Sequence, residues 1–600
     1  MSPKSAAAAP PASGLLRRVP ALDSLRSYGW GAARADLVAG LSVAAVAVPQ
    51  AMAYAMIAGL PAEYGLYTAI VMTAVGAVLD SSRQLINGPT NAISIALLSS
   101  VGGIAVLDER IQAAVLMAFL IGAIQLAISF ARLGDLTRYI SHSVIVGFTA
   151  GASLLLVLDQ MKNLLGLHQM GDVHDHFLYR FWLTMTDGGA VHPLTLQIGV
   201  ASLAMVLALR WVKRRLDWPL LPELLVVVSV MAAATAAFGW DRQGVAVVGD
   251  IPARLPSFRL PELDAVRMQE MASGALAIAL LGLLEAISMA KAIAAVTRQK
   301  LDLNQQCLSE GVANFTGSFF QCMPGSGSLT RSAINQQAGA QTQWSGVVSA
   351  AAVALIMLAF APWARFIPRS ALAGILILTA ARMVNFRDLR FHWRTSTFDA
   401  AIVATTAIAA FAISIEFCVL IGVFMSFMLA VPRTGQMHLT EFFVAHDGRI
   451  FERLRDDEAC GCLRIFGLEG EMFFGSGVSL EQHFESIEER LGPETQVVVL
   501  RLKRARNPDA VGIAQLDHFV ERMHGRGVVL VLCGVRHGML VCLEKSGVID
   551  EVGRDNVFPE QPVRQTSTML AVEHAQRLVE RPCAACRARR DGAPALHYQI

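Results

Sequence analysis

Residues 322–332 read Cys-Met-Pro-Gly-Ser-Gly-Ser-Leu-Thr-Arg-Ser and lie between two long apolar segments. Pro324 and the two glycines exclude a regular helix over residues 324–327, whereas the chain can become helical again from about Leu329. In a membrane, such an unwound segment is tolerated only where protein buries it or where it lines a cavity. A helix that restarts there directs unpaired backbone N–H groups, and the positive end of its dipole, into that cavity.

The side chains of this turn suit an anion. Hydroxyl groups of Ser328 and Thr330 and the charge of Arg331 stand beside the expected helix start. These groups predict a site for an anion, and the alternative is an ordinary Pro/Gly loop between two spans.

A second segment has the same form. Residues 88–94 read Gly-Pro-Thr-Asn-Ala-Ile-Ser, which combines helix breakers, a hydroxyl group and the start of an apolar helix. Paired interruptions at corresponding positions of two halves indicate the midplane site of a secondary transporter. Two helices that face each other N-terminus to N-terminus would hold an anion between their dipoles. The recurrence favours the anion site over an ordinary loop.

The composition indicates a membrane protein in contact with lipid. Of the 600 residues, 54% are hydrophobic and 16% are charged, against about 25% charged residues in soluble domains. The mean hydropathy is +0.48. The formal net charge of +2 gives no support to a nucleic-acid partner, and the nine cysteines are scattered, so we predict no disulfide framework.

Fourteen apolar segments follow one another along the chain. They lie near residues 36–58, 64–80, 91–103, 111–131, 143–166, 194–212, 220–239, 271–296, 304–321, 328–339, 345–364, 370–382, 398–414 and 416–431. The short ones are the third and the tenth, so each is third in a set of seven. This spacing predicts an all-α polytopic membrane domain over residues 31–432, with 14 spans in a 7+7 inverted repeat.

Charged loops predict the orientation of these spans. The loops after spans 4, 6, 8 and 12 are rich in Arg and Lys, whereas the opposite loops are acidic or mixed. The positive-inside rule then places both termini in the cytoplasm. Residues 1–30 lack the apolar core of a signal peptide, and we expect them to be a disordered cytoplasmic N-terminus. The expected location is the inner (plasma) membrane.

Ionisable residues are rare inside the predicted spans, and each costs at least ~2.5 kcal/mol at the bilayer centre. Glu285 is the clearest example, and a carboxyl group at that depth suits the binding and release of a proton. The alternative is a structural carboxyl group paired with Arg331.

In the first span, Gln50 and Tyr54 lie four residues apart and therefore on one helical face. Both can hydrogen-bond an oxyanion, and a Tyr–Gln packing pair is the alternative.

Three stretches carry a resemblance to a known family. Residues 36–54 read DLVAGLSVAAVAVPQAMAY, residues 59–67 read GLPAEYGLY and residues 81–90 read SSRQLINGPT. They resemble the sulfate permease (SulP) family, bacterial and plant relatives of the mammalian sulfate/multi-anion exchangers and prestin. The resemblance covers residues from about 30 to 560, nearly the whole chain.

The resemblance implies a mechanism and a set of site residues. It implies a core domain (spans 1–4 and 8–11) that moves like an elevator against a gate domain (spans 5–7 and 12–14), in a protein that forms homodimers. The anion is expected between half-helices 3 and 10. Matching motif to motif assigns substrate binding to Gln50, Tyr54, Thr90, Asn91, Ala92, Ser328, Leu329, Thr330 and Arg331. The eighth-span acidic position falls on Glu285, and Glu is typical of the proton-linked branch, whereas Asp resembles sodium-coupled bicarbonate carriers.

The expected function is secondary active transport of an inorganic oxyanion, namely sulfate by proton symport, without enzymatic activity or a cofactor. A bicarbonate or C4-dicarboxylate transporter, and an uncoupled anion exchanger or channel, remain alternatives. A dipole pair and one arginine suit all of these anions, so the residues do not separate them.

The chain after Pro432 is charged and alternates strands with helices, which predicts an α/β domain. Over residues 437–565 it resembles the STAS domain, which is related to anti-sigma-factor antagonists. The usual Asp-Ser at one helix start is Asp509-Ala510 here, so phosphorylation at that position is excluded.

Residues 566–600 are predicted to be a flexible basic tail. Zinc needs about four ligands, and only His574 and His597 lie near the single Cys583-x-x-Cys586 in sequence, so no metal site is predicted.

Overall fold

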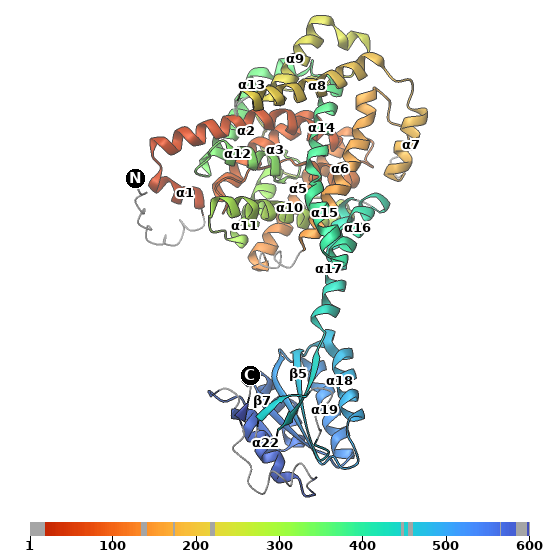
Figure 1. Ribbon diagram of the computed structural model, residues 1–600. Coiled ribbons are helices and arrows are strands. Elements are labelled where there is room, and N and C mark those ends of the chain that lie inside the picture. Colours follow the sequence, from red (N-terminus) through yellow and green to blue (C-terminus); the bar gives the residue numbers. More distant parts are fainter. Residues whose placement is uncertain are drawn as a thin grey trace. The chain divides into compact units, whose positions relative to one another are not determined.

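The computed structural model describes residues 19–133, 141–171, 175–216, 222–413, 415–445, 449–453, 460–563, 566–581, 583 and 597–598. The chain divides into two compact units, Met1–Ser426 and Phe427–Ile600. Unit 1 is almost entirely helical, and unit 2 combines helices with a sheet (Figure 1).

The helices of unit 1 coincide with the predicted apolar segments. They are α1 (Pro20–Ser24), α2 (Trp30–Ile57), α3 (Ala62–Leu79), α4 (Asn91–Val101), α5 (Leu107–Phe130), α6 (His142–Leu165), α7 (Phe177–Asp187), α8 (Pro193–Arg215), α9 (Glu223–Phe238), α10 (Ala265–Thr297), α11 (Leu303–Ser318), α12 (Leu329–Gln337), α13 (Trp344–Ala364), α14 (Arg369–Met383), α15 (Phe386–Thr395), α16 (Thr397–Ala412) and α17 (Ile415–Thr434), which continues into unit 2. Each of the fourteen predicted segments contains one helix, whereas α1, α7 and α15 were not predicted. Helix α1 lies within the stretch predicted to be disordered, because Ala21 is buried and its carbonyl oxygen accepts a hydrogen bond from the Trp344 indole.

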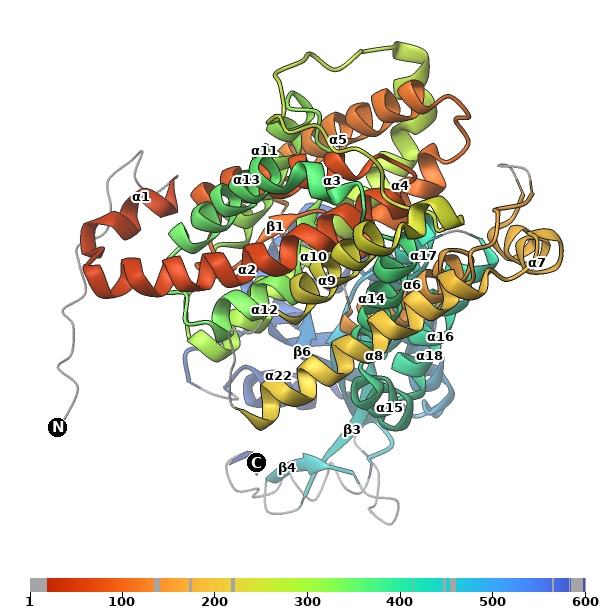
Figure 2. The same cartoon turned by 90° about the horizontal axis from the view of Figure 1, so that it is seen from above.

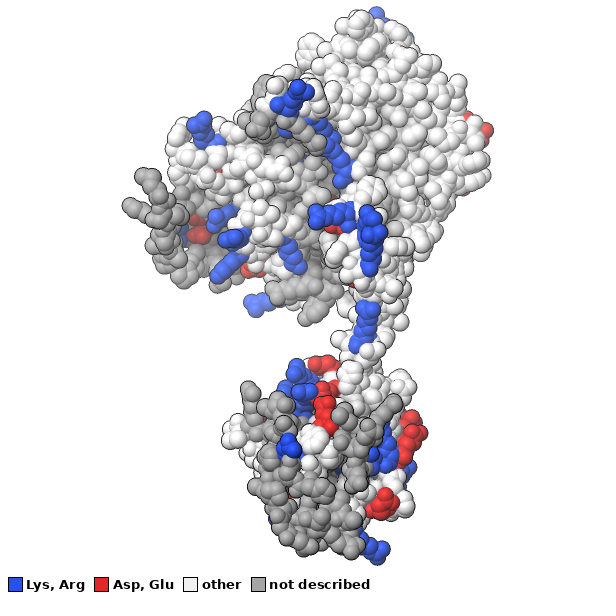
Figure 3. Space-filling model, in the orientation of Figure 1, with Lys and Arg blue, Asp and Glu red and all other residues white. Residues whose placement is uncertain are grey.

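Many of these helices are suited to a membrane. Within the described residues, nine helical stretches are long and apolar enough to cross one, and α4, α9 and α16 are shorter apolar helices. Helix α11 is more polar, but its polar residues Gln306, Ser309, Glu310, Asn314 and Ser318 are buried inside the protein. The right-hand part of unit 1 in Figure 3 is a broad surface with very few charged residues. Large apolar side chains such as Leu207, Leu355 and Phe424 are exposed, as expected where lipid replaces water.

The helices of unit 1 pack in two groups. In the first group, α5 packs on α11 and α13 packs on both α2 and α3; in the second, α6 packs on α14 and α16, and α8 packs on α14. In Figure 2, α3, α11 and α13 lie to the left of α6, α8 and α16.

Small residues permit these contacts. A Cβ atom at Gly40 of α2 would lie 2.6 Å from the carbonyl oxygen of Ser345, and one at Gly122 of α5 would lie 2.4 Å from the backbone nitrogen of Phe315. Close backbone approach at small residues drives helix association in membranes, where burial of apolar surface gives little advantage.

Unit 2 is built on one seven-stranded sheet. Its strands are β3 (His438–Val444), β4 (Arg449–Glu452), β5 (Leu463–Glu471), β6 (Val497–Arg506), β7 (Val529–Val535), β8 (Val557–Pro559) and β9 (His597–Tyr598), in the order β8-β7-β6-β5-β3-β4-β9. Strands β5 to β8 are parallel, and β3 is antiparallel to both β4 and β5. Helices α18 (Gly477–Glu489), α19 (Ala510–Gly525), α20 (His537–Ser546) and α21 (Val548–Val552) follow the strands. The predicted α/β alternation is therefore confirmed.

One prediction for the C-terminal end is wrong. Residues 566–578 were predicted to be flexible, but they form α22 (Thr566–Leu578), which packs on β6, β7 and β8. The reason is a buried stripe of Ala571, Val572 and Ala575, which closes the face of the sheet opposite α18 and α19. Residues 584–596, which include Cys586, lie outside the described residues.

Candidate anion-binding site

Two short strands join the interrupted segments. β1 (Asn87–Gly88) pairs antiparallel with β2 (Ser326–Gly327), so that Asn87 lies opposite Gly327 and Gly88 opposite Ser326. One strand leads into α4 and the other into α12. The Ser328 backbone N–H donates a hydrogen bond to the Ile86 carbonyl oxygen (2.9 Å), which continues the pairing to the start of α12. The two predicted helix starts therefore lie beside each other.

Arg331 extends from α12 across this pairing and is fully buried. Its Nη2 donates a hydrogen bond to the Pro89 carbonyl oxygen at 2.8 Å. Among the described residues, its Nε and Nη1 atoms have no hydrogen-bond partner. A buried guanidinium group is costly unless an anion and further hydrogen bonds compensate its charge, and a planar fork of free N–H groups matches an oxyanion.

Glu285 is hydrogen-bonded to the residue directly before α4. The Thr90 hydroxyl donates a hydrogen bond to Glu285 Oε2 at 3.0 Å and accepts one from the Ile93 backbone N–H at 3.4 Å. Thr90 is thus the N-cap of α4 and also the partner of the carboxyl group. Within the described residues no ion pair shorter than 4.0 Å joins Glu285 to Arg331. In this conformation Glu285 is therefore not directly paired with Arg331, which was the alternative to a proton-binding role.

A cavity of about 310 Å³ opens beside α12, and Gln50, Leu329 and Thr330 are on its wall. Gln50 is 1% exposed, and neither Nε2 nor Oε1 has a hydrogen-bond partner among the described residues. A buried amide without partners costs about 1–3 kcal/mol, so this side chain is suited to a polar ligand. The cavity wall also carries the cationic side chains of Arg210, Lys213 and Arg382.

The remaining predicted residues are close in the chain to these groups but are not on the cavity wall. They are Tyr54, Asn91, Ala92 and Ser328, all of them buried, and the buried Thr90 and Arg331 are not on the wall either. The predicted residues therefore form two sets: one lines the cavity, and the other is buried with the helix starts.

Two buried acids were missed by sequence reasoning. Asp80, directly after α3, accepts hydrogen bonds from Ser309 Oγ (2.6 Å), Gln306 Nε2 (2.7 Å) and Asn87 Nδ2 (3.1 Å). Glu310 of α11 is fully buried, and neither carboxyl oxygen has a hydrogen-bond partner among the described residues. Glu310 was detectable as an acid inside the ninth predicted span, whereas Asp80 falls at a predicted span end and resembled a loop residue. Through Asn87, this acidic pair is linked to β1.

Comparison with known proteins identifies the family. The family described as "Sulfate permease family" matches residues 34–406, and the "STAS domain" family matches residues 455–562. The chain belongs to the sulfate permease family. This is a family of transporters, and the chain is a multi-pass membrane protein with a STAS domain.

Relatives in the sulfate permease family match along most of the chain. It is 28% identical to "Sulfate transporter 4.1, chloroplastic" of Arabidopsis thaliana, over 89% of this chain and 80% of the relative. It is 31% identical to the "Sodium-independent sulfate anion transporter" of Bos taurus, over 68% of this chain and 71% of the relative. The solved structure of the murine Solute Carrier 26 family member A9 anion transporter, in the inward-facing state, has the same fold. Its TM-score is 0.84 at 21% identity, and the match covers 96% of this chain and 97% of that one.

Proposed function

We propose that this protein is a secondary transporter that carries sulfate, together with a proton, across the plasma membrane. The observation that carries the proposal is the pairing of β1 with β2, beside which the buried Arg331 has two unpaired N–H-bearing atoms. Relatives named as sulfate transporters in a plant and a mammal support the choice of substrate.

In this proposal, the anion is held by charge and by backbone dipoles. The positive ends of α4 and α12 and the guanidinium group of Arg331 attract it. Thr330 and Gln50 supply neutral hydrogen bonds from the cavity wall. The wall cations Arg210 and Arg382 lie near the C-terminal ends of α8 and α14, at the side that the charge pattern assigns to the cytoplasm. With that topology the cavity is the cytoplasmic entrance.

The contacts in unit 1 support the 7+7 inverted repeat. Spans 1–7 are α2, α3, α4, α5, α6, α8 and α9, and spans 8–14 are α10, α11, α12, α13, α14, α16 and α17. Exchanging each span for its counterpart seven spans away turns the α2–α13 contact into α5–α10. It also turns α3–α13 into α5–α11 and α2–α12 into α4–α10. Likewise the α6–α16 contact becomes α8–α14. All of these helix pairs pack together, and two unrelated halves would have no reason to repeat their contacts in this way.

The two groups of helices support an elevator-type mechanism. The core group consists of α2–α5 and α10–α13 and carries the site, whereas the gate group includes α6, α8, α9, α14 and α16. We propose that the core slides against the gate in a homodimer, with both termini in the cytoplasm.

Glu285 links the proton to the anion in this mechanism. An ionised Glu285 repels an anion at the start of α4, because its carboxyl group is bonded to the capping residue Thr90. Protonation removes that charge, so proton and anion bind together.

Uptake into proteoliposomes tests this function. The full-length protein is reconstituted, and labelled sulfate uptake is measured with and without an inward proton gradient, with bicarbonate and a C4-dicarboxylate as competitors. We expect saturable sulfate uptake that the gradient accelerates. Uptake that only follows exchange against internal anion would contradict symport, and stronger competition by bicarbonate or dicarboxylate would contradict the substrate.

Gly88→Ala tests the place of Arg331 in the site. Gly88 has φ +145°, and an added Cβ would lie 2.9 Å from Arg331 Nη1 and 3.1 Å from Nη2. We expect the guanidinium group to be displaced and sulfate affinity, measured by calorimetry, to fall by about tenfold or more, the cost of one charged hydrogen bond. Gly339→Ala is the matched control, since its φ is +90° but no atom lies within 4 Å of the new Cβ. Equal affinities in the two variants would contradict this arrangement.

A further inference from the structure

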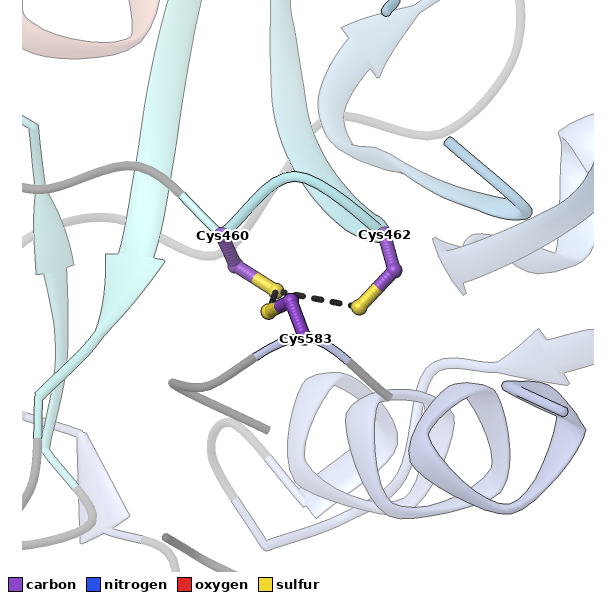
Figure 4. A group of neighbouring side chains, drawn as sticks. All are labelled: Cys460, Cys462 and Cys583. Atoms are coloured by element: carbon purple, nitrogen blue, oxygen red, sulfur yellow. Dashed lines mark hydrogen bonds between the residues drawn. The ribbon is translucent and has the colours of Figure 1, made fainter. Parts of the chain in front are cut away.

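Three cysteines of unit 2 meet at one end of the sheet (Figure 4). Cys460 Sγ lies 3.6 Å from Cys462 Sγ and 3.5 Å from Cys583 Sγ. All three sulfur atoms lie within 4.8 Å of one another, with Cys462 buried and the other two half-buried. Cys460 and Cys583 are 123 residues apart in the chain, so the fold brings them together.

These distances suit a metal site. Zinc–thiolate bonds of about 2.3 Å in a tetrahedron place neighbouring sulfur atoms about 3.8 Å apart. A disulfide bond requires about 2.05 Å. The observed separations of 3.5 and 3.6 Å are close to the first value and far from the second.

Hydrogen bonds of Gln496 hold the segments of Cys462 and Cys583 together independently of any ion. Gln496 Oε1 accepts hydrogen bonds from the backbone N–H groups of Glu580 and Arg581, and its Nε2 donates to the Arg581 carbonyl oxygen. The Gln496 backbone N–H donates to the Cys462 carbonyl oxygen at 3.0 Å. One residue therefore fastens the segment before Cys583 to the segment that contains Cys462.

We propose that Cys460, Cys462 and Cys583 bind a structural zinc ion. Each thiol releases its proton and binds as a thiolate, which is the form that zinc prefers. This reverses the prediction that the tail holds no metal, which considered only ligands close in sequence.

The bound ion would fasten the end of the STAS domain. Helix α22 ends at Leu578, and Cys583 follows it. A metal that joins Cys583 to the start of β5 closes a loop of more than one hundred residues. Closing a long loop lowers the conformational entropy of the unfolded chain more than closing a short one, and so stabilises the folded domain more. The site is separate from the anion site and does not depend on the proposed transport activity.

Metal analysis of the full-length protein tests the proposal. The protein is purified in detergent with a thiol reductant and without added chelator, and its zinc is measured by mass spectrometry. We expect about one zinc per chain, and at least a tenfold lower content in Cys460→Ser/Cys583→Ser. Cys542→Ser is the matched control, because Cys542 is a partly buried cysteine of α20 in the same unit, and it is expected to keep the zinc.

A second measurement needs no variant. Reconstitution of the wild-type protein with Co²⁺ should give thiolate-to-cobalt charge-transfer absorption, and excess Zn²⁺ should abolish it. Folded wild-type protein that binds neither ion under reducing conditions would overturn the proposal. A disulfide between Cys460 and Cys583 in peptides from protein that was never exposed to oxidant would overturn it as well.

Discussion

Arg331→Ala is expected to weaken sulfate binding about 10- to 150-fold while leaving the fold intact. A charged hydrogen bond is worth ~1.5–3 kcal/mol, and ~1.4 kcal/mol corresponds to a factor of ten. The guanidinium group makes one hydrogen bond to the protein, at Pro89, and its other polar nitrogens are unpaired among the described residues. Alanine therefore removes little internal bonding, and calorimetry with sulfate should report the loss of binding directly.

Two further substitutions make the Arg331 result specific. Arg331→Lys keeps the charge but not the planar fork, so an intermediate affinity is expected. Arg382→Ala removes a cation from the cavity wall, where the effect should be small and should fade as salt screens the charge. Near-normal sulfate affinity in Arg331→Ala would remove this arginine from the site.

Glu285→Gln is expected to abolish uptake driven by an inward proton gradient while sulfate exchange persists. The glutamine resembles a permanently protonated glutamate, and its side-chain carbonyl can still accept the hydrogen bond from Thr90. Exchange requires no net movement of protons, whereas symport requires a group that binds and releases one. Both activities are measured in proteoliposomes of equal protein content.

The control for Glu285 is another acid near the cavity. Glu223→Gln alters a carboxylate that already pairs with Arg210 (3.3 Å) and Lys213 (3.2 Å), and gradient-driven uptake should survive in it. Gradient-driven uptake that also survives in Glu285→Gln would end the proton-carrier hypothesis. Loss of both activities would instead assign Glu285 a structural role.

The positions of most helices in unit 1 could be predicted because their causes are local. Apolar runs of membrane length, and breakers such as Pro89 and Pro324, determine where a helix can form without reference to the rest of the chain. The same applies to unit 2, where Asp509 caps α19 through hydrogen bonds from the backbone N–H groups of Val511 and Gly512.

The contacts of the candidate site could be predicted only in part. That Arg331 and Thr90 stand at helix starts follows from nearby residues, but the hydrogen bond from Thr90 to Glu285 joins groups 195 positions apart. The buried acids show the same limit, because the Asp80 carboxylate accepts hydrogen bonds from Gln306 and Ser309 of another helix. Its burial depends on the packing of α3 against α11, which no local pattern encodes.

The sequence by itself determined the two interrupted helices, the apolar segments, the family and the α/β character of the second unit. Only the tertiary structure decided that β1 pairs with β2, that α22 covers the sheet and that Cys583 meets Cys460 and Cys462. The physical reason is range. Backbone propensity and hydrophobic periodicity act over a few residues, whereas strand pairing, burial and thiol clusters depend on which distant segments pack together.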